Sequence, residues 1–221
     1  METLSNLLFH SKYRSNIVSS DIIHSLVGGS SSRRWGLVNR AIKSGELLKL
    51  KRGLYLLNPS ITNIELSKMY IANRLVAESY ISYETALNHY NWLQEKSNSV
   101  QSCIYRGRSQ EFVNHFGHFT YENVSVSSNG FLFGVNRILL SEKPILIATP
   151  ERAFCDLVCK RKLKWKGLID LCEQLRIDIT YIYNLDLEKL SLLSGIYKSP
   201  NVKTLLSKLL GALGGSYASD N

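Results

Sequence analysis

Two consecutive glycines, Gly28-Gly29, separate two short amphipathic segments and constrain the fold more than any other feature. In the first segment, SSDIIHSLV, Ser19 or Ser20 can cap a helix with an apolar inner face. The second, SSRRWGLVNRAIKSG, begins with Ser30 or Ser31 as its cap and ends in a glycine suited to the position after a helix. Since paired glycines disfavour helix, the sequence predicts helix, turn and helix.

A β-hairpin is predicted directly after the second of these helices. The segment ELLKLKRGLYLLNP contains two short apolar runs around Lys51-Arg52-Gly53, and Asn58-Pro59 closes it. A leucine stripe at Leu4, Leu7 and Leu8 predicts one more short helix at the beginning of the chain. Helices followed by a hairpin are typical of a winged helix-turn-helix, which we expect over residues 1–60.

The remaining residues, 61–221, are expected to form a second and larger domain. Helical patterns in IELSKMYIANRLVAE and SYETALNHYNWL precede a stretch rich in Val, Ile, Phe and Tyr between residues 99 and 147. The best strand candidates there are VQSCIY, HFTYENV, GFLFGV and PILIA. Helices are expected again in PERAFCDLVCKRK, GLIDLCEQL and NVKTLLSKLLGAL. The predicted fold class is α+β: an N-terminal winged helix-turn-helix, then a mixed domain with a small sheet flanked by helices.

Positive charge is concentrated in the first domain. Of the formal net charge of +9, residues 1–60 contribute nine Lys or Arg against three acidic residues, and the rest of the chain has eighteen against fifteen. A basic segment on a nearly balanced body indicates a polyanion as its partner. The hydrophobic content of 44% and the charged content of 20% are those of a folded globular protein.

The helix after the glycines divides into an apolar and a basic side. The residues expected to face the core are Trp35, Val38, Ala41 and Ile42. The residues on the opposite face are Arg33, Gly36, Arg40 and Lys43. A recognition helix in the major groove needs this division. Arg33 and Arg34 lie in its first turn, where an arginine can bind guanine through two hydrogen bonds. Ser31 and Ser32 lie near amides that favour a phosphate.

The hairpin tip supplies further cations, Lys49, Lys51 and Arg52, which fit phosphate or minor-groove contact. An ordinary solvated helix face is the alternative, but the ordered combination of cap, glycines, basic helix and basic hairpin favours double-stranded DNA. The candidate DNA-binding residues are Ser31, Ser32, Arg33, Arg34, Arg40, Lys43, Lys49, Lys51 and Arg52.

Three segments in order resemble one protein family. From Ser19 to Leu57 the chain resembles the winged helix of AbiEi-type abortive-infection antitoxins of type IV toxin–antitoxin systems. YISYETAL at residues 80–87 looks like the opening of that family's second domain, and ATPERAFCDL at residues 148–157 like its helix after the sheet. The resemblance implies a transcriptional autorepressor that binds inverted repeats in its own promoter. It also implies an antitoxin that opposes a cognate nucleotidyltransferase toxin, directly or functionally.

A second basic patch has two interpretations. It comprises Lys160, Arg161, Lys162, Lys164 and Lys166. Its first members can complement a helix C-terminus while the others are solvated, or the patch can contact DNA or an acidic partner. The four cysteines form no CxxC pair and are expected as buried free thiols. We expect a cytoplasmic protein, because no signal peptide and no membrane span is recognisable.

No catalytic motif is recognisable, so we expect no enzyme, no cofactor and no bound metal. Gly28-Gly29-Ser30 superficially resembles the turn that opens a nucleotidyltransferase site, but the paired carboxylates that such a site needs are replaced by Arg40-Ala41-Ile42-Lys43. Two alternatives stay open for residues 61–221. The domain can neutralise a partner protein by direct binding, or it can hold an enzyme activity without a recognisable motif.

Overall fold

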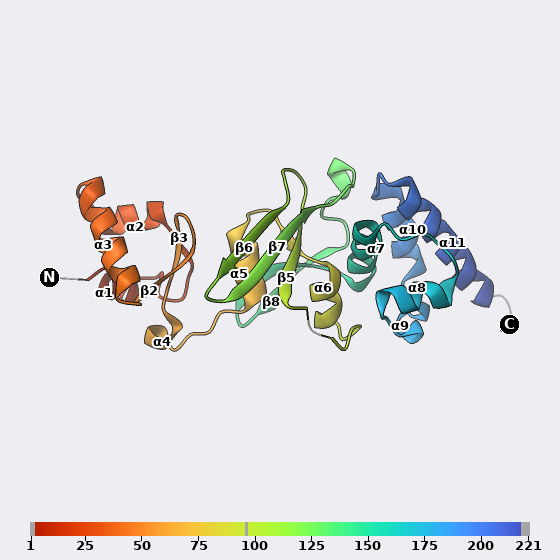
Figure 1. The fold of residues 1–221 in the computed structure, drawn as a ribbon, viewed down its shortest axis with the longest axis horizontal. Coiled ribbons are helices and arrows are strands. Elements are labelled where there is room, and N and C mark those ends of the chain that lie inside the picture. Colours follow the sequence, from red (N-terminus) through yellow and green to blue (C-terminus); the bar gives the residue numbers. More distant parts are fainter. Residues whose placement is uncertain (1–2, 96, 218–221) are drawn as a thin grey trace. The chain divides into compact units, whose positions relative to one another are not determined.

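The computed structural model describes residues 3–95 and 97–217, and the chain forms two compact units (Figure 1). Unit 1 comprises Met1–Ala77 and Phe112–His118, and unit 2 comprises Glu78–Glu111 and Phe119–Asn221. Unit 1 therefore extends beyond residue 60, where we expected the boundary, and takes in a short segment from the middle of the chain.

The first part of unit 1 contains the three helices and the hairpin that the sequence predicts, and a short third strand, β1, that it does not. In chain order the elements are α1 (Leu4–Phe9), β1 (Val18–Ser19), α2 (Ser20–Val27), α3 (Ser31–Lys43), β2 (Leu47–Lys51) and β3 (Leu54–Leu57). Strand β3 is central in the order β1-β3-β2 and antiparallel to both neighbours. Helices α4 (Pro59–Thr62) and α5 (Lys68–Leu75) follow.

The predicted serine caps of α2 and α3 are confirmed, and an apolar core joins the helices to the sheet. Ser19 Oγ accepts a hydrogen bond from the Ile22 amide (3.4 Å), and Ser30 Oγ accepts one from the Arg33 amide (3.3 Å). The core gathers residues from all three helices and the sheet: Leu4, Leu8, Val18, Ile23, Val38, Ala41, Leu47, Tyr55 and Leu57. Packing of these apolar faces, rather than helix propensity, stabilises helices as short as α1 and α2.

A second, six-stranded sheet has the order β6-β7-β5-β4-β9-β8. Its strands are β4 (Tyr80–Ile81), β5 (Ser99–Ile104), β6 (Gln110–Asn114), β7 (Gly117–Asn123), β8 (Val135–Leu140) and β9 (Lys143–Ala148). Strand β4 is antiparallel to β5 and parallel to β9, and β8 is antiparallel to β9. The sheet is therefore mixed, and the predicted α+β class is confirmed.

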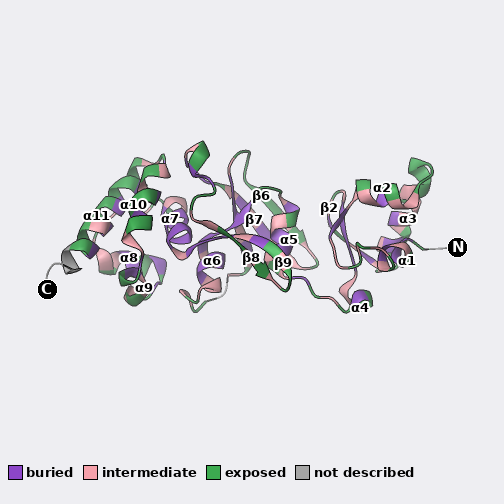
Figure 2. Ribbon diagram, turned by 180° about the vertical axis from the view of Figure 1, so that it is seen from behind, coloured by how far each residue is buried: buried purple, intermediate pink, exposed green. Residues whose placement is uncertain are grey.

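Helices make up most of the rest of unit 2. They are α6 (Tyr83–His89), the 3-10 helix η1 (Ser128–Gly130), α7 (Pro150–Arg161), α8 (Leu168–Leu175), α9 (Ile179–Tyr183), α10 (Leu187–Ile196) and α11 (Pro200–Tyr217). Helix α7 packs against α6, α10, α11 and β9, and residues 151–158 are all buried (Figure 2). No helix of the described residues is both long enough and apolar enough to cross a bilayer.

A buried ion pair on α7 organises the core of unit 2. Arg152 and Asp156 lie one turn apart, both fully shielded from solvent, with Arg152 Nε 3.1 Å from Asp156 Oδ1. The other guanidinium nitrogens donate to the carbonyls of Gly130 (3.0 Å) and Phe133 (2.8 Å) and to the Tyr80 hydroxyl (2.6 Å). Every branch of this guanidinium therefore has an acceptor, as a buried charge requires.

Asp156 accepts hydrogen bonds from three hydroxyls, two in the β4 region and one after α10. Its oxygens accept hydrogen bonds from Tyr197 (2.6 Å), Ser82 (2.7 Å) and Tyr80 (3.0 Å). Burial raises the pKa of the Tyr80 and Tyr197 hydroxyls well above its ordinary value, and the Asp156 carboxylate raises it further. Both phenols therefore stay protonated and act as donors.

The charge on Arg152 depends on the same carboxylate. Burial is the largest single influence on the pKa of this guanidinium and lowers it, but Asp156, Tyr197, Tyr80 and Cys103 together outweigh burial, so the pKa lies above its ordinary value. The network joins β4, α7 and the segment after α10. It also brings together YISYETAL and ATPERAFCDL, the two later segments on which the family resemblance rests.

The prediction that GFLFGV is a strand is wrong. Residues 128–130 form η1, a turn follows, and β8 begins only at Val135. The Gly130 and Phe133 carbonyls accept from Arg152, and Gly134 has a φ of 71°, so the backbone bends around the guanidinium. Most of β8 and all of β6 were not predicted, and β4 is a short strand between two expected helices.

Candidate nucleic-acid interface

The turn between α2 and α3 depends on its two glycines. Gly28 has a φ of 63° and Gly29 a φ of 75°, in a region that residues with a side chain rarely adopt. Arg34 folds back over this turn, donating from Nη1 to the Gly29 carbonyl (2.9 Å) and from Nη2 to Ser31 Oγ (3.0 Å). Arg34, predicted to contact DNA, therefore braces the start of α3 in this structure.

The other cations predicted on α3 are exposed. Arg33, Arg40 and Lys43 lie on the side of the helix opposite the buried Val38 and Ala41. Within the part of the chain that the structure describes, none of the three has a carboxylate at ion-pair distance. Their charge is therefore available to an anionic partner.

The apolar stripe predicted for α3 is only partly buried. Val38 and Ala41 belong to the core and Ile42 packs against it, but 60% of the Trp35 surface is exposed. The prediction that Trp35 faces the core is wrong. The first residue of α3 that packs against the core is Leu37, so the beginning of the helix, which includes Trp35, lies outside the core.

The hairpin β2–β3 presents two of its three predicted cations. Lys49 and Arg52 are exposed, while Leu50, Leu54 and Leu56 are buried and Leu48 is half-buried. The hairpin side chains that pack in the core with the helices are Leu47, Tyr55 and Leu57. The pairing of β2 with β3 shifts in register between Lys49 and Lys51, so the side chains of these two lysines point in different directions.

Lys51 is engaged inside unit 1. Its ammonium donates to the Leu75 carbonyl and lies 5.6 Å from the centre of the Phe112 ring. Asn114 Nδ2 donates to the Leu50 carbonyl (3.2 Å), so residues 112–118 brace the same strand. Of the predicted hairpin contacts, Lys49 and Arg52 therefore remain the stronger candidates for phosphate.

The second basic patch divides into a paired and an exposed half. Lys160 Nζ lies 2.6 Å from Glu122 Oε1 and 4.5 Å from the centre of the Tyr83 ring, and Arg161 Nη2 lies 2.7 Å from Glu84 Oε1. The remaining members, Lys162, Lys164 and Lys166, are exposed. The first half is thus structural, and both interpretations stay open for the three lysines.

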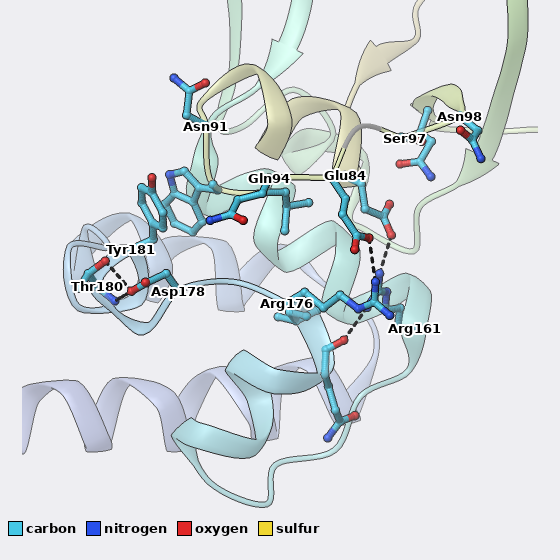
Figure 3. Close-up of a pocket in the computed structure, with 16 residues that line it drawn as sticks. Glu84, Asn91, Gln94, Ser97, Asn98, Arg161, Arg176, Asp178, Thr180 and Tyr181 are labelled. Atoms are coloured by element: carbon cyan, nitrogen blue, oxygen red, sulfur yellow. Dashed lines mark hydrogen bonds and ion pairs between the residues drawn. The ribbon is translucent and has the colours of Figure 1, made fainter.

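A polar pocket of about 770 Å³ opens in unit 2 near the ends of α6, α7 and α8 (Figure 3). At its wall Arg161 donates to Glu84 and to the Gln174 carbonyl (2.6 Å), and Arg176 pairs with Glu95 (2.7 Å). Because both guanidiniums are matched by carboxylates, the pocket offers a polyanion less than the α3 face does.

Three of the four cysteines have the buried environment that the sequence predicts. Cys103, Cys155 and Cys172 are buried free thiols, and Cys159 is partly buried. Burial raises the pKa of the Cys103 and Cys155 thiols well above its ordinary value, so they are poor nucleophiles. Among the described residues, no group of three or more His, Cys, Asp or Glu side chains is placed to hold a metal ion.

The structure brings most predicted DNA-binding residues onto neighbouring elements, α3 and the β2–β3 hairpin, which contact each other. Asn39, which sequence reasoning passed over, is half-buried on α3 one turn after Trp35. No family model matches the chain, and no curated protein matches it either.

Proposed function

We propose that the chain binds double-stranded DNA through a winged helix-turn-helix formed by its first ~60 residues, with α3 as the recognition helix. The order of elements supports this proposal. A helix, a glycine turn and a second helix are followed by the β2–β3 hairpin, and strand β3 of this hairpin also pairs with β1. The buried side of α3 fixes the helix on the core, and its other side stays open.

One observation carries the proposal. Arg33, Arg40 and Lys43 are exposed on one face of α3 without carboxylate partners among the described residues. Exposed cations cost the fold little, so the chain itself does not need to neutralise this face. DNA supplies the missing counter-charge, since it carries one negative charge per ~1.7 Å of duplex.

Base reading and phosphate binding are divided between α3 and the hairpin in this proposal. Arg33 near the start of the helix reads a guanine, while Arg40 and Lys43 line the groove farther along. Lys49 and Arg52 neutralise phosphates and carry little sequence information. Ser31 and Ser32 lie in the first turn of α3, where the helix dipole also favours a phosphate.

The biological role that we propose follows the resemblance to AbiEi-type antitoxins. The chain then represses its own toxin–antitoxin operon from inverted repeats in the promoter and opposes a nucleotidyltransferase toxin in the cytoplasm. The meeting of YISYETAL and ATPERAFCDL in one buried network supports treating them as parts of a single structural signature. Unit 2 is the part proposed to act on the toxin.

A gel-shift titration tests DNA binding. The full chain is titrated against a duplex from its own promoter and a scrambled duplex of equal composition. We expect the promoter to be preferred, and the double variant Arg33→Ala/Arg40→Ala to lose about tenfold or more of that affinity. Its thermal midpoint should hardly move, because exposed substitutions change stability by about 0.5 kcal/mol or less. Unaltered affinity would remove α3 from the interface.

The matched control is Lys203→Ala/Lys208→Ala, which removes the same charge from exposed positions of α11 in unit 2. It should leave promoter affinity unchanged. The antitoxin role is tested by reading the neighbouring open reading frame and expressing its product with the full chain. We expect the Arg33→Ala/Arg40→Ala variant to lose repression of the operon but still to protect cell growth from the neighbouring gene product. If the neighbouring gene product is not toxic, the antitoxin role is wrong.

A further inference from the structure

Trp35 is the largest apolar side chain on α3, and 60% of its surface is exposed. Exposed aromatic side chains of this size are enriched where proteins meet their partners, because burial on binding removes much apolar surface from water. The core of unit 1 does not use Trp35, since its contacts on α3 begin at Leu37.

The position of Trp35 on the helix relates it to the cationic face. At about 100° per residue, Asn39 lies about 40° and Ser32 about 60° around the helix from Trp35, and Lys43 about 80°. These residues form a flank along α3 between the buried stripe and Arg40. Of the cations on α3, Lys43 is the nearest to the indole around the helix, whereas Arg40 and Arg33 lie about 140° and about 160° away. A duplex that contacts Lys43 therefore also meets the indole.

The chemistry of this flank matches one base pair better than the others. In the major groove an A·T pair presents the thymine methyl group beside the adenine N6 and N7 edge. An apolar side chain packs on the methyl group, and an asparagine amide can bind the adenine edge through two hydrogen bonds. Trp35 and Asn39, one turn apart, supply this pair of groups.

We propose that Trp35 is a specificity-determining residue that packs against a thymine methyl group in the major groove, with Asn39 beside it. The proposal rests on the proposed DNA binding and deepens it by naming a base that α3 reads. The cations on α3 hold the helix in the groove, and Trp35 selects the register in which a thymine lies beneath the indole.

A thymine-to-uracil exchange tests the proposal, because uracil lacks only the methyl group. The wild-type chain first defines its footprint on the promoter duplex, and each thymine in the footprint is then replaced singly by deoxyuridine. At one or more positions wild-type affinity should fall about fourfold, the value of one buried methyl group. Trp35→Ala should bind about tenfold more weakly, and at that position it should not distinguish thymine from uracil.

The control variant is Leu139→Ala, which removes an exposed apolar side chain from unit 2 and should bind as the wild type does. Circular dichroism checks folding. If Trp35→Ala misfolds, the exchange is repeated with Trp35→Phe, which should show a reduced methyl effect. The tryptophan fluorescence of the wild type should also change when DNA is added, and the part of this change that comes from Trp35 should be missing in Trp35→Phe.

The outcomes separate the inference from the function beneath it. A wild-type chain that does not prefer its promoter to scrambled DNA overturns the proposed DNA binding itself. A wild-type chain that prefers its promoter, with Trp35→Ala binding equally well, overturns only the inference. Weaker binding of Trp35→Ala with an unchanged methyl effect at every position also overturns it, since Trp35 then contacts the backbone or a second protein copy.

Discussion

The exposed cations of α3 and the hairpin in unit 1 contrast with the paired cations on α7 in unit 2. On α3 of unit 1 the cations point to solvent without carboxylate partners among the described residues, and at the hairpin Lys49 and Arg52 do the same. In unit 2, Lys160 pairs with Glu122 and Arg161 with Glu84, and Arg152 is neutralised inside the core by Asp156. Arginine and lysine are thus exposed to solvent on α3 and the hairpin, whereas at these positions of unit 2 they form ion pairs within the fold.

The difference shows how a charged residue that stabilises the fold can be distinguished from one that is available to a ligand. A fully buried ion pair such as Arg152–Asp156 is costly to break, because one charge is left without a partner in a medium of low dielectric. An exposed cation costs the fold almost nothing and is therefore free to be selected for a ligand. Substitutions in unit 2 should mainly change stability, and substitutions on α3 and the hairpin should mainly change binding.

The largest expected effect is on the stability of unit 2. Asp156→Ala strands the Arg152 guanidinium and removes the acceptor of three hydroxyls, so unfolding should become about 3–5 kcal/mol easier. Urea unfolding followed by the fluorescence of Trp92 and Trp165 measures this. Glu122→Ala, which breaks the partly exposed pair with Lys160, is the control and should cost about 1 kcal/mol or less.

Thiol labelling gives a second readout of that prediction. Cys103 and Cys155 are buried and their thiols have raised pKa values, so they should react only when unit 2 opens. Because all four cysteines lie in unit 2, labelling should accelerate in Asp156→Ala and stay slow in Arg33→Ala. Equal labelling rates in both variants would show that the network does not hold unit 2 closed.

The next effect concerns the hairpin cations. Lys49→Ala/Arg52→Ala should weaken promoter and scrambled DNA alike and make the log–log salt dependence of binding shallower, by about 0.9 for each lost phosphate contact. Lys51→Ala is the matched control: its ammonium already donates to the Leu75 carbonyl, so the variant should lower the stability of unit 1 and leave the slope unchanged. A steep slope in the double variant would exclude these residues from phosphate contact.

A smaller effect is expected at the cap of α3. Ser30→Ala removes the oxygen that accepts from the Arg33 amide and should destabilise unit 1 by about 1 kcal/mol. The exposed neighbour Ser32 does not cap the helix, so Ser32→Ala should leave stability unchanged. Thermal unfolding followed by circular dichroism distinguishes the two. Equal midpoints for both variants would contradict the assignment of Ser30 as the cap.

The smallest effect contrasts a charged cap in unit 2 with the neutral cap in unit 1. The Lys189 amide and side chain lower the pKa of Asp186, which caps α10. A carboxyl group whose pKa is lowered in the folded state stabilises the folded protein at pH values above its ordinary pKa. This stabilisation is lost as the pH falls through the folded-state pKa. The midpoint difference between wild type and Asp186→Ala should therefore shrink as the pH falls below the ordinary aspartate range, whereas the Ser30→Ala difference should persist.

Local chemistry in the sequence determined the elements of the first 60 residues. The serine caps, the paired glycines and the hairpin signal each act over a few residues, so α2, α3 and the β2–β3 pair could be predicted before their packing was known. The same holds for α7, where Pro150 occupies the first turn. The concentration of positive charge in residues 1–60 is likewise a property of composition alone.

Tertiary structure decided which of the predicted residues are free to act. Periodicity places Trp35 on the apolar side of α3, but only the packed structure determines how far along the helix the core reaches. Arg34 and Lys51 look like any exposed cation in the sequence, yet each donates to a backbone carbonyl that the fold brings near. These contacts depend on where the backbone goes, which residue type and local spacing do not encode.

The core of unit 2 was also beyond local reasoning. Tyr197 lies 41 residues from Asp156 and Tyr80 lies 76 away, so no spacing in the sequence indicates that their hydroxyls share one carboxylate. The turn at GFLFGV is apolar and β-prone, and a strand there is a reasonable expectation from propensity. Arg152 overrides it, because a buried guanidinium must find acceptors, and the carbonyls of that turn are the ones within reach.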